Sequence, residues 1–203
     1  MIIETVFEQG SEEWLAARRL SIGGTGIEKI ITSKGMPSKS RGKYLYEKAG
    51  QRITGKSKSI FTTYEMQWGH DYEPEARELF SLIDGSEVEQ CAMIFSDEKR
   101  NWHVSPDGIL KGLNKGLEIK CPQLEAHDKY CNDAKLPTKY ILQIQTSLAL
   151  TGFESWFFMS YYPGGVTPFI IEVPRDESLI KTIKIEVRLF QNDLDKLITK
   201  LKN

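Results

Sequence analysis

The sequence contains little that a secreted or membrane protein needs. Its 203 residues include no run of eighteen apolar residues, so no membrane-spanning helix is expected. The opening residues, Met-Ile-Ile-Glu-Thr, lack the basic and apolar regions of a signal peptide. The three cysteines, Cys91, Cys121 and Cys131, lack CxxC spacing and indicate neither a disulfide framework nor a metal cluster. We therefore expect a cytoplasmic protein with reduced thiols and no membrane partner.

Signatures of nucleotide cofactors are also missing. The P-loop order GxxxxGK[ST] does not occur, and no Gly-rich dinucleotide fingerprint is present, which argues against a small-molecule α/β enzyme. No internal repeat, low-complexity tract or linker divides the chain. Because its length and its 40% hydrophobic content suffice for a buried core, residues 1–203 are predicted to form a single domain.

The net charge of −1 hides a segregation of charge along the chain. Residues 29–58 contain nine lysines or arginines and one acidic residue, Glu47, so this segment carries +8 and the remainder −9. Such a segment is typical of a surface that binds nucleic-acid phosphates. It is equally typical of a solvated helix and loop, and the segment alone does not decide between the two.

Hydrophobic periodicity and turn residues predict an α/β fold, with a mixed sheet flanked by helices. Helices are expected at residues 12–20, 41–52, 69–83, 140–150 and 177–202. Strands are expected at residues 88–95, 101–104, 117–121, 155–162 and 167–173. The last helix has an apolar stripe, which predicts either docking onto the protein's own sheet or a coiled-coil seam.

The stretch SPDGILKGLNKGLEIKC, residues 105–121, carries the most specific chemical pattern. In a strand, Glu118 and Lys120 share one face while Leu117 and Ile119 share the other. A hairpin would bring Asp107 beside Glu118, and such carboxylates suit Mg²⁺ and metal-dependent phosphodiester hydrolysis. The alternative is a solvated Glu-x-Lys pair on an exposed face that follows an ordinary Pro-Asp-Gly turn.

Three further motifs surround this pattern. Glu73, in the run WGHDYEPEAR, lies near the predicted start of a helix, where it can reach a metal or a water bound to it. Arg18 ends a helix and precedes Gly23-Gly24-Thr25, which together offer guanidinium, hydroxyl and backbone N–H groups to a phosphate. Gln143 and Gln145 share a predicted helix, and the sequence does not decide which of them faces a site. His70 and His103 receive no role.

Taken together and in order, these motifs resemble the PD-(D/E)XK nuclease signature. More specifically, they resemble the bacteriophage lambda exonuclease family, also called YqaJ-type viral recombinases, over roughly residues 8–173. The resemblance implies that the sheet and its helices form a PD-(D/E)XK, restriction-endonuclease-like domain.

The resemblance also implies roles for individual residues. Asp107, Glu118 and the main-chain carbonyl of Ile119 would bind the metal, two Mg²⁺ ions with Mn²⁺ as the alternative. The other catalytic residues would be Lys120, which positions or activates the attacking water, Glu73 and Gln143. Arg18 and Thr25 would bind a 5′-terminal phosphate, with Thr25 at a position where the family has serine.

The implied activity is a metal-dependent 5′–3′ deoxyribonuclease that digests one strand of linear duplex DNA. It would leave 3′ single strands for recombination by a single-strand annealing protein, in the cytoplasm of a bacterium or a phage-infected host. Members of the lambda type form trimers around duplex DNA, so a trimer is expected. Two alternatives are a structure- or sequence-specific endonuclease on the same fold and a non-catalytic DNA-end-binding recombination protein.

Overall fold

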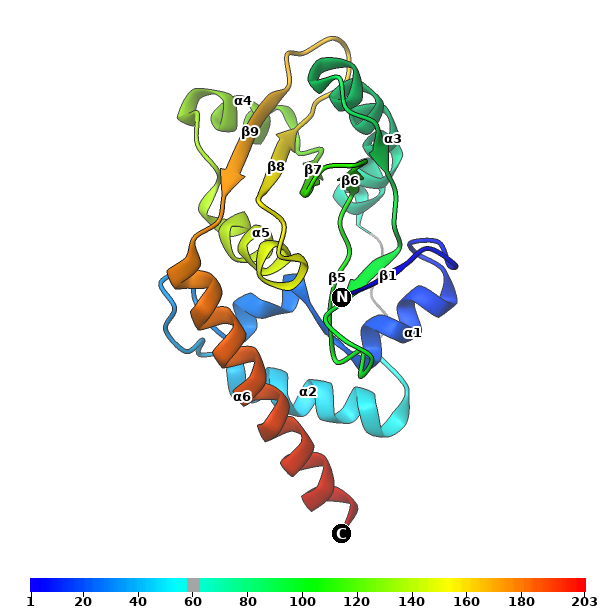
Figure 1. The fold of residues 1–203 in the computed structure, drawn as a ribbon, viewed down its shortest axis with the longest axis vertical. Helices are drawn as coiled ribbons and strands as arrows, with labels where there is room; N and C mark the ends of the chain where they lie inside the picture. Colours follow the sequence, from blue (N-terminus) through cyan, green and yellow to red (C-terminus); the bar gives the residue numbers. More distant parts are fainter. Residues whose placement is uncertain (58–62) are drawn as a thin grey trace.

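A computed structural model describes residues 1–57 and 63–203, and in this part of the chain the strands form two mixed sheets (Figure 1). The first sheet has the order β1-β4-β5-β2, with β1 (Ile2–Glu4), β2 (Ile22–Gly23), β4 (Met93–Phe95) and β5 (Trp102–Val104). The second has the order β3-β6-β7-β8-β9, with β3 (Val88–Glu89), β6 (Gly108–Leu110), β7 (Lys115–Lys120), β8 (Ser155–Ser160) and β9 (Phe169–Pro174). The predicted mixed α/β class is confirmed, but the prediction of a single sheet is wrong.

Helices pack around both sheets. They are α1 (Glu12–Leu20), the 3₁₀ helix η1 (Gly24–Lys29), α2 (Arg41–Thr54), α3 (Tyr64–Asp84), α4 (Leu124–Asp133), α5 (Thr138–Thr151) and α6 (Glu177–Lys202). Of the helices in the described residues, none combines the length and hydropathy needed to cross a membrane.

The second sheet begins inside a segment that the sequence predicted as one strand, residues 88–95. Val88 pairs with Leu110 of β6, whereas Ile94 pairs with Val104 of β5, so the two ends of the segment belong to different sheets. Between them Cys91 is buried, and its carbonyl accepts a hydrogen bond from the Gln9 side chain at 3.0 Å. An apolar run gives no sign of which partner strand each half will take, because pairing is decided by residues far away in sequence.

All five predicted helices are present, one of them with a start that differs by five residues, and the α-helix α4 was not predicted. The Ser11 side chain caps α1 by accepting from Trp14 N. Helix α3 begins at Tyr64, five residues before the predicted start at residue 69, with the Thr63 hydroxyl as its cap. Helix α4 was not predicted, because only His127 and Tyr130 of its ten residues are buried and no apolar stripe marks it.

Helix α6 docks inside the protein through the apolar stripe seen in its sequence. Its buried residues face α2 and α5, and the Phe190 ring stacks on Tyr44 at 5.4 Å between centroids. The stripe consists of Leu179, Ile180, Ile183, Val187, Phe190 and Leu194. The intramolecular alternative is therefore the one observed, with neighbouring helices as the surface on which α6 docks.

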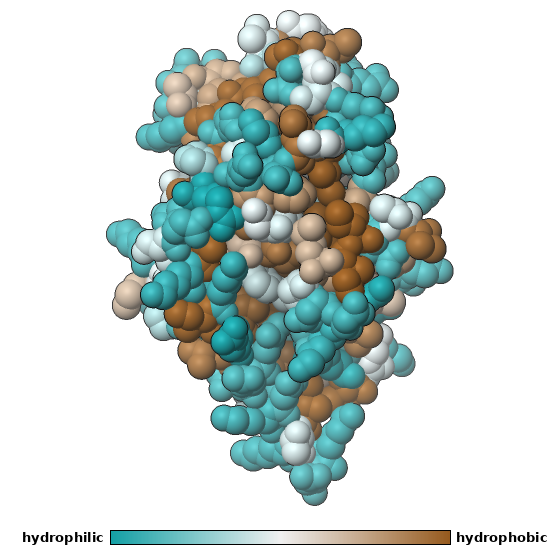
Figure 2. Space-filling model, in the orientation of Figure 1, coloured by the Kyte–Doolittle hydropathy of each residue, from teal (hydrophilic) through white to brown (hydrophobic). Residues whose placement is uncertain are grey.

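The basic segment presents less free positive charge than its composition suggested. Arg41 pairs with Glu186 at 2.8 Å and Arg52 with Asp195 at 3.2 Å, both on α6. Lys48 is buried and donates to the main-chain oxygens of α1 residues 18 and 19. The exposed cations of the segment are Lys34, Lys39, Lys43 and Lys56, while Lys58 lies outside the described residues. Figure 2 shows a mainly hydrophilic surface over the end of the molecule that holds α2 and the last turns of α6.

The strand that carries the LEIK motif lies between two helices. Leu117 and Ile119 of β7 are buried with Ala76 and Phe80 of α3 in one apolar cluster. Glu118 lies on the opposite face and contacts Gln143 of α5. The predicted alternation is confirmed. The face of β7 that carries Glu118 lies against α5, whereas the sequence alone had left open a solvent-exposed face.

Candidate active site

The hairpin between β6 and β7 brings the two acidic residues of the motif together. Gly108 pairs with Leu117, so the Asp107 main chain lies beside the strand and its N–H donates to Leu117 O at 3.2 Å. The Asp107 carboxylate accepts from the Ile119 N–H at 2.6 Å. The predicted proximity of Asp107 and Glu118 is therefore observed, although their chemical roles stay predictions.

Glu118 is the centre of a hydrogen-bonded group. Its carboxylate is buried, and Oε1 accepts from Gln143 Nε2 at 2.6 Å and from the Lys120 ammonium. The Lys120 ammonium also lies 5.6 Å from the centre of the Tyr140 ring. These contacts argue against the solvated Glu-x-Lys alternative, because Glu118 is buried and accepts hydrogen bonds from Gln143 and Lys120.

The structure decides between the two glutamines that the sequence left open. Gln143 faces Glu118, whereas Gln145 is buried on the other side of α5. The Gln145 amide donates to Pro174 O at 2.9 Å and accepts from Asp176 N at 2.9 Å, so it fastens the start of α6. Gln143 is therefore the glutamine that contacts the acidic cluster, and its catalytic role stays a prediction, whereas the contacts of Gln145 are structural.

Helix α3 contributes Glu73 from the other side of the hairpin. The Glu73 carboxylate pairs with Arg77 one turn later, and Arg77 Nε donates to Asp107 O at 2.8 Å. These contacts couple Glu73 to Asp107 through one guanidinium. Arg77 was not among the predicted site residues, although its i, i+4 spacing from Glu73 in the sequence was the signal that pointed to it.

Burial dominates the electrostatics of the three acidic residues. Burial and the Asp107 carboxylate raise the pKa of Glu73 to about 7 against the opposing effect of Arg77 and Lys120. Burial raises the pKa of Glu118 to about 7 and also raises the pKa of Asp107, although Lys120 opposes both shifts. Burial alone would lower the pKa of Lys120, but the Glu118 and Asp107 carboxylates outweigh it and raise that pKa. Clustered carboxylates of this kind are favourable sites for a cation.

Few side chains are available to bind a metal ion, and their ligand atoms are oxygens. The described residues contain no group of three or more His, Cys, Asp or Glu side chains arranged to hold a metal ion. Two carboxylates, Asp107 and Glu118, adjoin the main chain of Ile119, so the neighbouring donors are oxygens. An all-oxygen set with few protein ligands fits Mg²⁺, which keeps several waters, better than zinc, whose sites typically include cysteine or histidine.

Arg18 and Thr25 lie in the same part of the molecule as this cluster. Both line a small cavity together with Ser105 and Gln143, so the predicted phosphate ligands adjoin a residue that touches Glu118. The Arg18 guanidinium lies 4.2 Å from the centre of the Trp14 ring. Trp14, which was not predicted as a site residue, is fixed by hydrogen bonds of 3.1 Å to Ala92 O and Ser105 Oγ.

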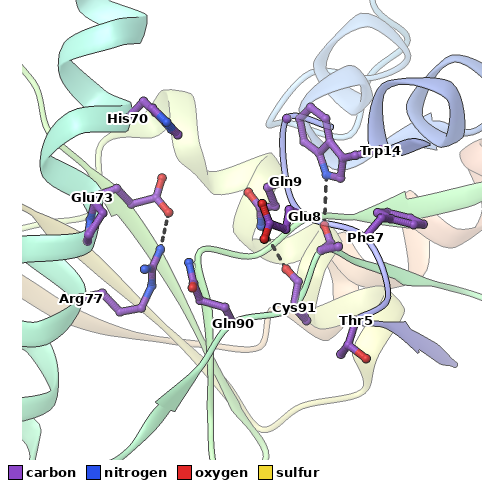
Figure 3. A pocket seen from close by; sticks show the side chains of 13 residues that line it. Thr5, Phe7, Glu8, Gln9, Trp14, His70, Glu73, Arg77, Gln90 and Cys91 are labelled. Carbon is purple, nitrogen blue, oxygen red and sulfur yellow. Dashed lines mark hydrogen bonds and ion pairs between the residues drawn. The ribbon is translucent and has the colours of Figure 1, made fainter. Parts of the chain in front are cut away.

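Trp14 also lines a larger cleft of ≈ 570 Å³ (Figure 3). Helix α3 supplies His70, Glu73 and Arg77 to one wall, and the N-terminal segment supplies Phe7 to Gly10 and Trp14 to the other. Glu73 is therefore reachable from the outside. His70, which the sequence left without a role, lies on this wall and has exposed surface.

Residues 13–154 match the family described as the YqaJ-like viral recombinase domain. The chain belongs to this family. This YqaJ-like chain is 28% identical over 165 residues to an uncharacterized protein of Acanthamoeba polyphaga mimivirus, in a match that covers 75% of this chain. The match covers 29% of the viral protein, so the chain spans less than a third of that relative's length.

Solved structures extend the likeness to nearly the whole chain. The alkaline exonuclease LHK-Exo of Laribacter hongkongensis is 32% identical, with a TM-score of 0.84 over 95% of this chain and 96% of that one. Its complex with dAMP gives 31% identity and a TM-score of 0.83 over the same shares. A phage-related exonuclease from Haemophilus somnus 129PT, 17% identical with a TM-score of 0.70 over 90% and 96% of the two chains, shares the fold. The resemblance inferred from the motifs is thus confirmed, and the YqaJ-like chain is homologous to an alkaline exonuclease.

His103 gives a prediction about stability. It is buried and lines the small cavity that also contains Arg18 and Thr25, with Nδ1 2.5 Å from Ser21 Oγ. Burial, together with the charges of Arg18 and Lys48, lowers the pKa of His103 to about 3. The unfolded chain takes up a proton below pH 6.5 while the folded chain stays neutral, so the free energy of unfolding falls as the pH drops. Between pH 7 and pH 5 this one group removes about 2 kcal/mol.

Urea unfolding of the wild type and of His103→Asn at both pH values measures this effect. Asparagine keeps a donor near the position of Nδ1 but does not titrate. We expect the variant to lose less stability than the wild type between pH 7 and pH 5. Equal losses in the two proteins would contradict an uncharged His103 in the folded state.

Proposed function

We propose that the chain is a Mg²⁺-dependent exonuclease that digests one strand of linear duplex DNA from a 5′-phosphorylated end. The observation that carries the proposal is the hydrogen-bonded group that Lys120 and Gln143 form around the buried Glu118, beside Asp107. Homology to LHK-Exo, an alkaline exonuclease with a dAMP complex, supports DNA as the substrate. In the resulting assignment the site belongs to a PD-(D/E)XK domain.

Each side chain of the site has a proposed role in hydrolysis. Asp107, Glu118 and the Ile119 carbonyl would hold the cations, two Mg²⁺ or alternatively Mn²⁺. When bound, these cations would supply positive charge at the phosphate and would lower the pKa of a water. Gln143 holds one oxygen of Glu118 and so fixes the direction of the carboxylate. Lys120 carries an ammonium group to the same oxygen, where it orients the attacking water and donates to the phosphate.

The neighbouring cavity supports digestion from a 5′-phosphorylated end. Arg18 offers a guanidinium fork and Thr25 an exposed hydroxyl, and both adjoin Gln143. A terminal phosphate bound there places the first phosphodiester bond near Asp107 and Glu118. The exposed lysines of residues 29–58 give the duplex a salt-sensitive attraction.

Linear and circular DNA separate this proposal from the endonuclease on the same fold. We expect purified protein with Mg²⁺ to release mononucleotides from linear duplex and to leave closed circular DNA intact. Products should come from the strand with the 5′-phosphate, with the complementary strand left as a 3′ overhang. Cleavage of the circle would favour the endonuclease, and binding of DNA ends without any release would favour the non-catalytic recombination protein.

Arg18→Ala should reduce the preference for 5′-phosphorylated ends. A charge-assisted hydrogen bond contributes about 1.5–3 kcal/mol, so the ratio of kcat/KM for 5′-phosphate over 5′-hydroxyl duplex should fall about tenfold to a hundredfold. Arg188→Ala, which removes an exposed arginine from α6, is the matched control and should keep the ratio. An equal loss on both substrates would show that Arg18 serves general backbone binding or folding.

Two wider features belong to the same proposal. The first is a trimer that encloses duplex DNA, and the second is a single-strand annealing protein that takes up the 3′ strands. Both come from the family resemblance.

A further inference from the structure

Arg77 uses its whole guanidinium to join three segments of the chain. Nε donates to the main-chain oxygen of Asp107 at 2.8 Å, and a terminal nitrogen pairs with the Glu73 carboxylate. The Gln90 amide lies against the same group, and with its oxygen turned toward Arg77 it accepts from both terminal nitrogens at 2.8 and 3.1 Å. Figure 3 shows the guanidinium next to Glu73 and Gln90 on the wall of the cleft.

These contacts fix the position of Glu73 relative to Asp107. Glu73 is on α3 and Asp107 precedes β6, so no stretch of regular secondary structure sets the distance between them. Arg77 holds Glu73 by its side chain and Asp107 by its main chain. Only 12% of the Arg77 side chain is exposed, which leaves the guanidinium little freedom to move.

The shape of the arginine side chain matters for this arrangement. A guanidinium is a flat fork with donors that point in fixed directions, and it can serve a carbonyl, a carboxylate and an amide at once. A lysine ammonium provides the same charge from a single point and cannot reproduce the three directions. The three acceptors around Arg77 therefore constrain geometry as well as charge.

We propose that Arg77 is a positioning residue that holds Glu73 against Asp107 and so shapes the cation site. This inference rests on the proposed function, because it assumes that Asp107 and Glu118 bind Mg²⁺. Arg77 does not act on the substrate itself. It fixes the Asp107 main chain, whose carboxylate is held in turn by the Ile119 N–H. Residues that orient metal ligands in this way change metal affinity about tenfold to a hundredfold when removed.

Calorimetric titration with MgCl₂ in the absence of DNA tests the proposal on Arg77→Ala and Arg77→Lys. We expect at least tenfold weaker Mg²⁺ binding in both variants, with thermal unfolding followed in parallel. Arg41→Ala is the matched control, because Arg41 also makes a half-buried ion pair, with Glu186 of α6 far from the acidic cluster. The control should show an ordinary loss of stability and wild-type Mg²⁺ affinity.

The variants distinguish geometry from charge and from folding. Wild-type Mg²⁺ affinity in Arg77→Lys would overturn the proposal, since charge alone would then suffice, and this variant decides the matter if Arg77→Ala does not fold. Wild-type affinity in a folded Arg77→Ala would overturn it as well. Asp107→Ala separates this failure from that of the proposed function: if Asp107→Ala keeps Mg²⁺ binding, the cation site itself is misassigned.

Discussion

Glu118→Ala should reduce DNA cleavage by about three orders of magnitude or more, since stabilisation of several kcal/mol by a bound cation corresponds to such factors. Glu118 is buried and holds both Lys120 and Gln143, so its removal also releases the two side chains that act beside it. Cleavage of 5′-phosphorylated linear duplex, measured at saturating Mg²⁺, gives the comparison with the wild type.

Glu118→Gln makes this test sharper. Glutamine keeps the volume of the side chain and an oxygen that can accept from Gln143, but it removes the negative charge. Burial raises the pKa of Glu118 to about 7, so the neutral amide should cost little stability while cleavage is still lost. We therefore expect Glu118→Gln to keep nearly the wild-type unfolding temperature and to lose cleavage.

Glu172→Ala provides the matched control for Glu118. Glu172 is also an acidic residue in the second sheet, and it pairs with Lys115 at 2.8 Å and accepts from the Ser155 hydroxyl. It lies on β9 and makes none of the contacts of the acidic cluster, so its removal should leave cleavage near the wild-type level. Near wild-type cleavage by Glu118→Ala would show that the site assignment is wrong.

Gly116→Ala should destabilise the fold by on the order of 3 kcal/mol. Gly116 pairs with Trp156 on the neighbouring parallel strand, and the fully buried indole ring packs across it. A Cβ at this position would lie 2.4–2.6 Å from three atoms of the ring, closer than real carbon atoms approach. The ring cannot move away easily, because Phe153 stacks on it at 6.0 Å between centroids.

Urea unfolding of Gly116→Ala should show a lower midpoint with a similar slope. Gly50→Ala is the control, because Gly50 lies inside α2 with nothing within 4 Å of its ideal Cβ position. That substitution should stabilise the protein by about 0.5–1 kcal/mol through helix propensity. Gly116 is two residues before Glu118, so cleavage by the Gly116 variant should also fall at temperatures where the wild type is fully folded. A midpoint equal to the wild type would mean that the sheet accommodates the extra methyl group.

The sequence by itself determined the elements whose signals are local. The spacing of apolar residues predicted α6, and turn residues separated the predicted strands 155–162 and 167–173, which pair as β8 and β9. It also determined which face of β7 carries Glu118 and Lys120, because a strand alternates its side chains with a period of two. The ordered motifs were sufficient to indicate the family.

The tertiary structure alone decided features that depend on distant partners. The segment 88–95 divides between two sheets because its halves pair with β6 and β5, and no local property of the segment records that choice. Gln143 and Gln145 are two residues apart on one helix, and only the packing of α5 assigns the first to Glu118 and the second to the start of α6. Both arginines of the basic segment and its buried Lys48 make contacts inside the fold, which a count of charges does not reveal. Arg77 reaches Asp107 across thirty residues of sequence, and such a contact exists only once α3 has packed against the hairpin.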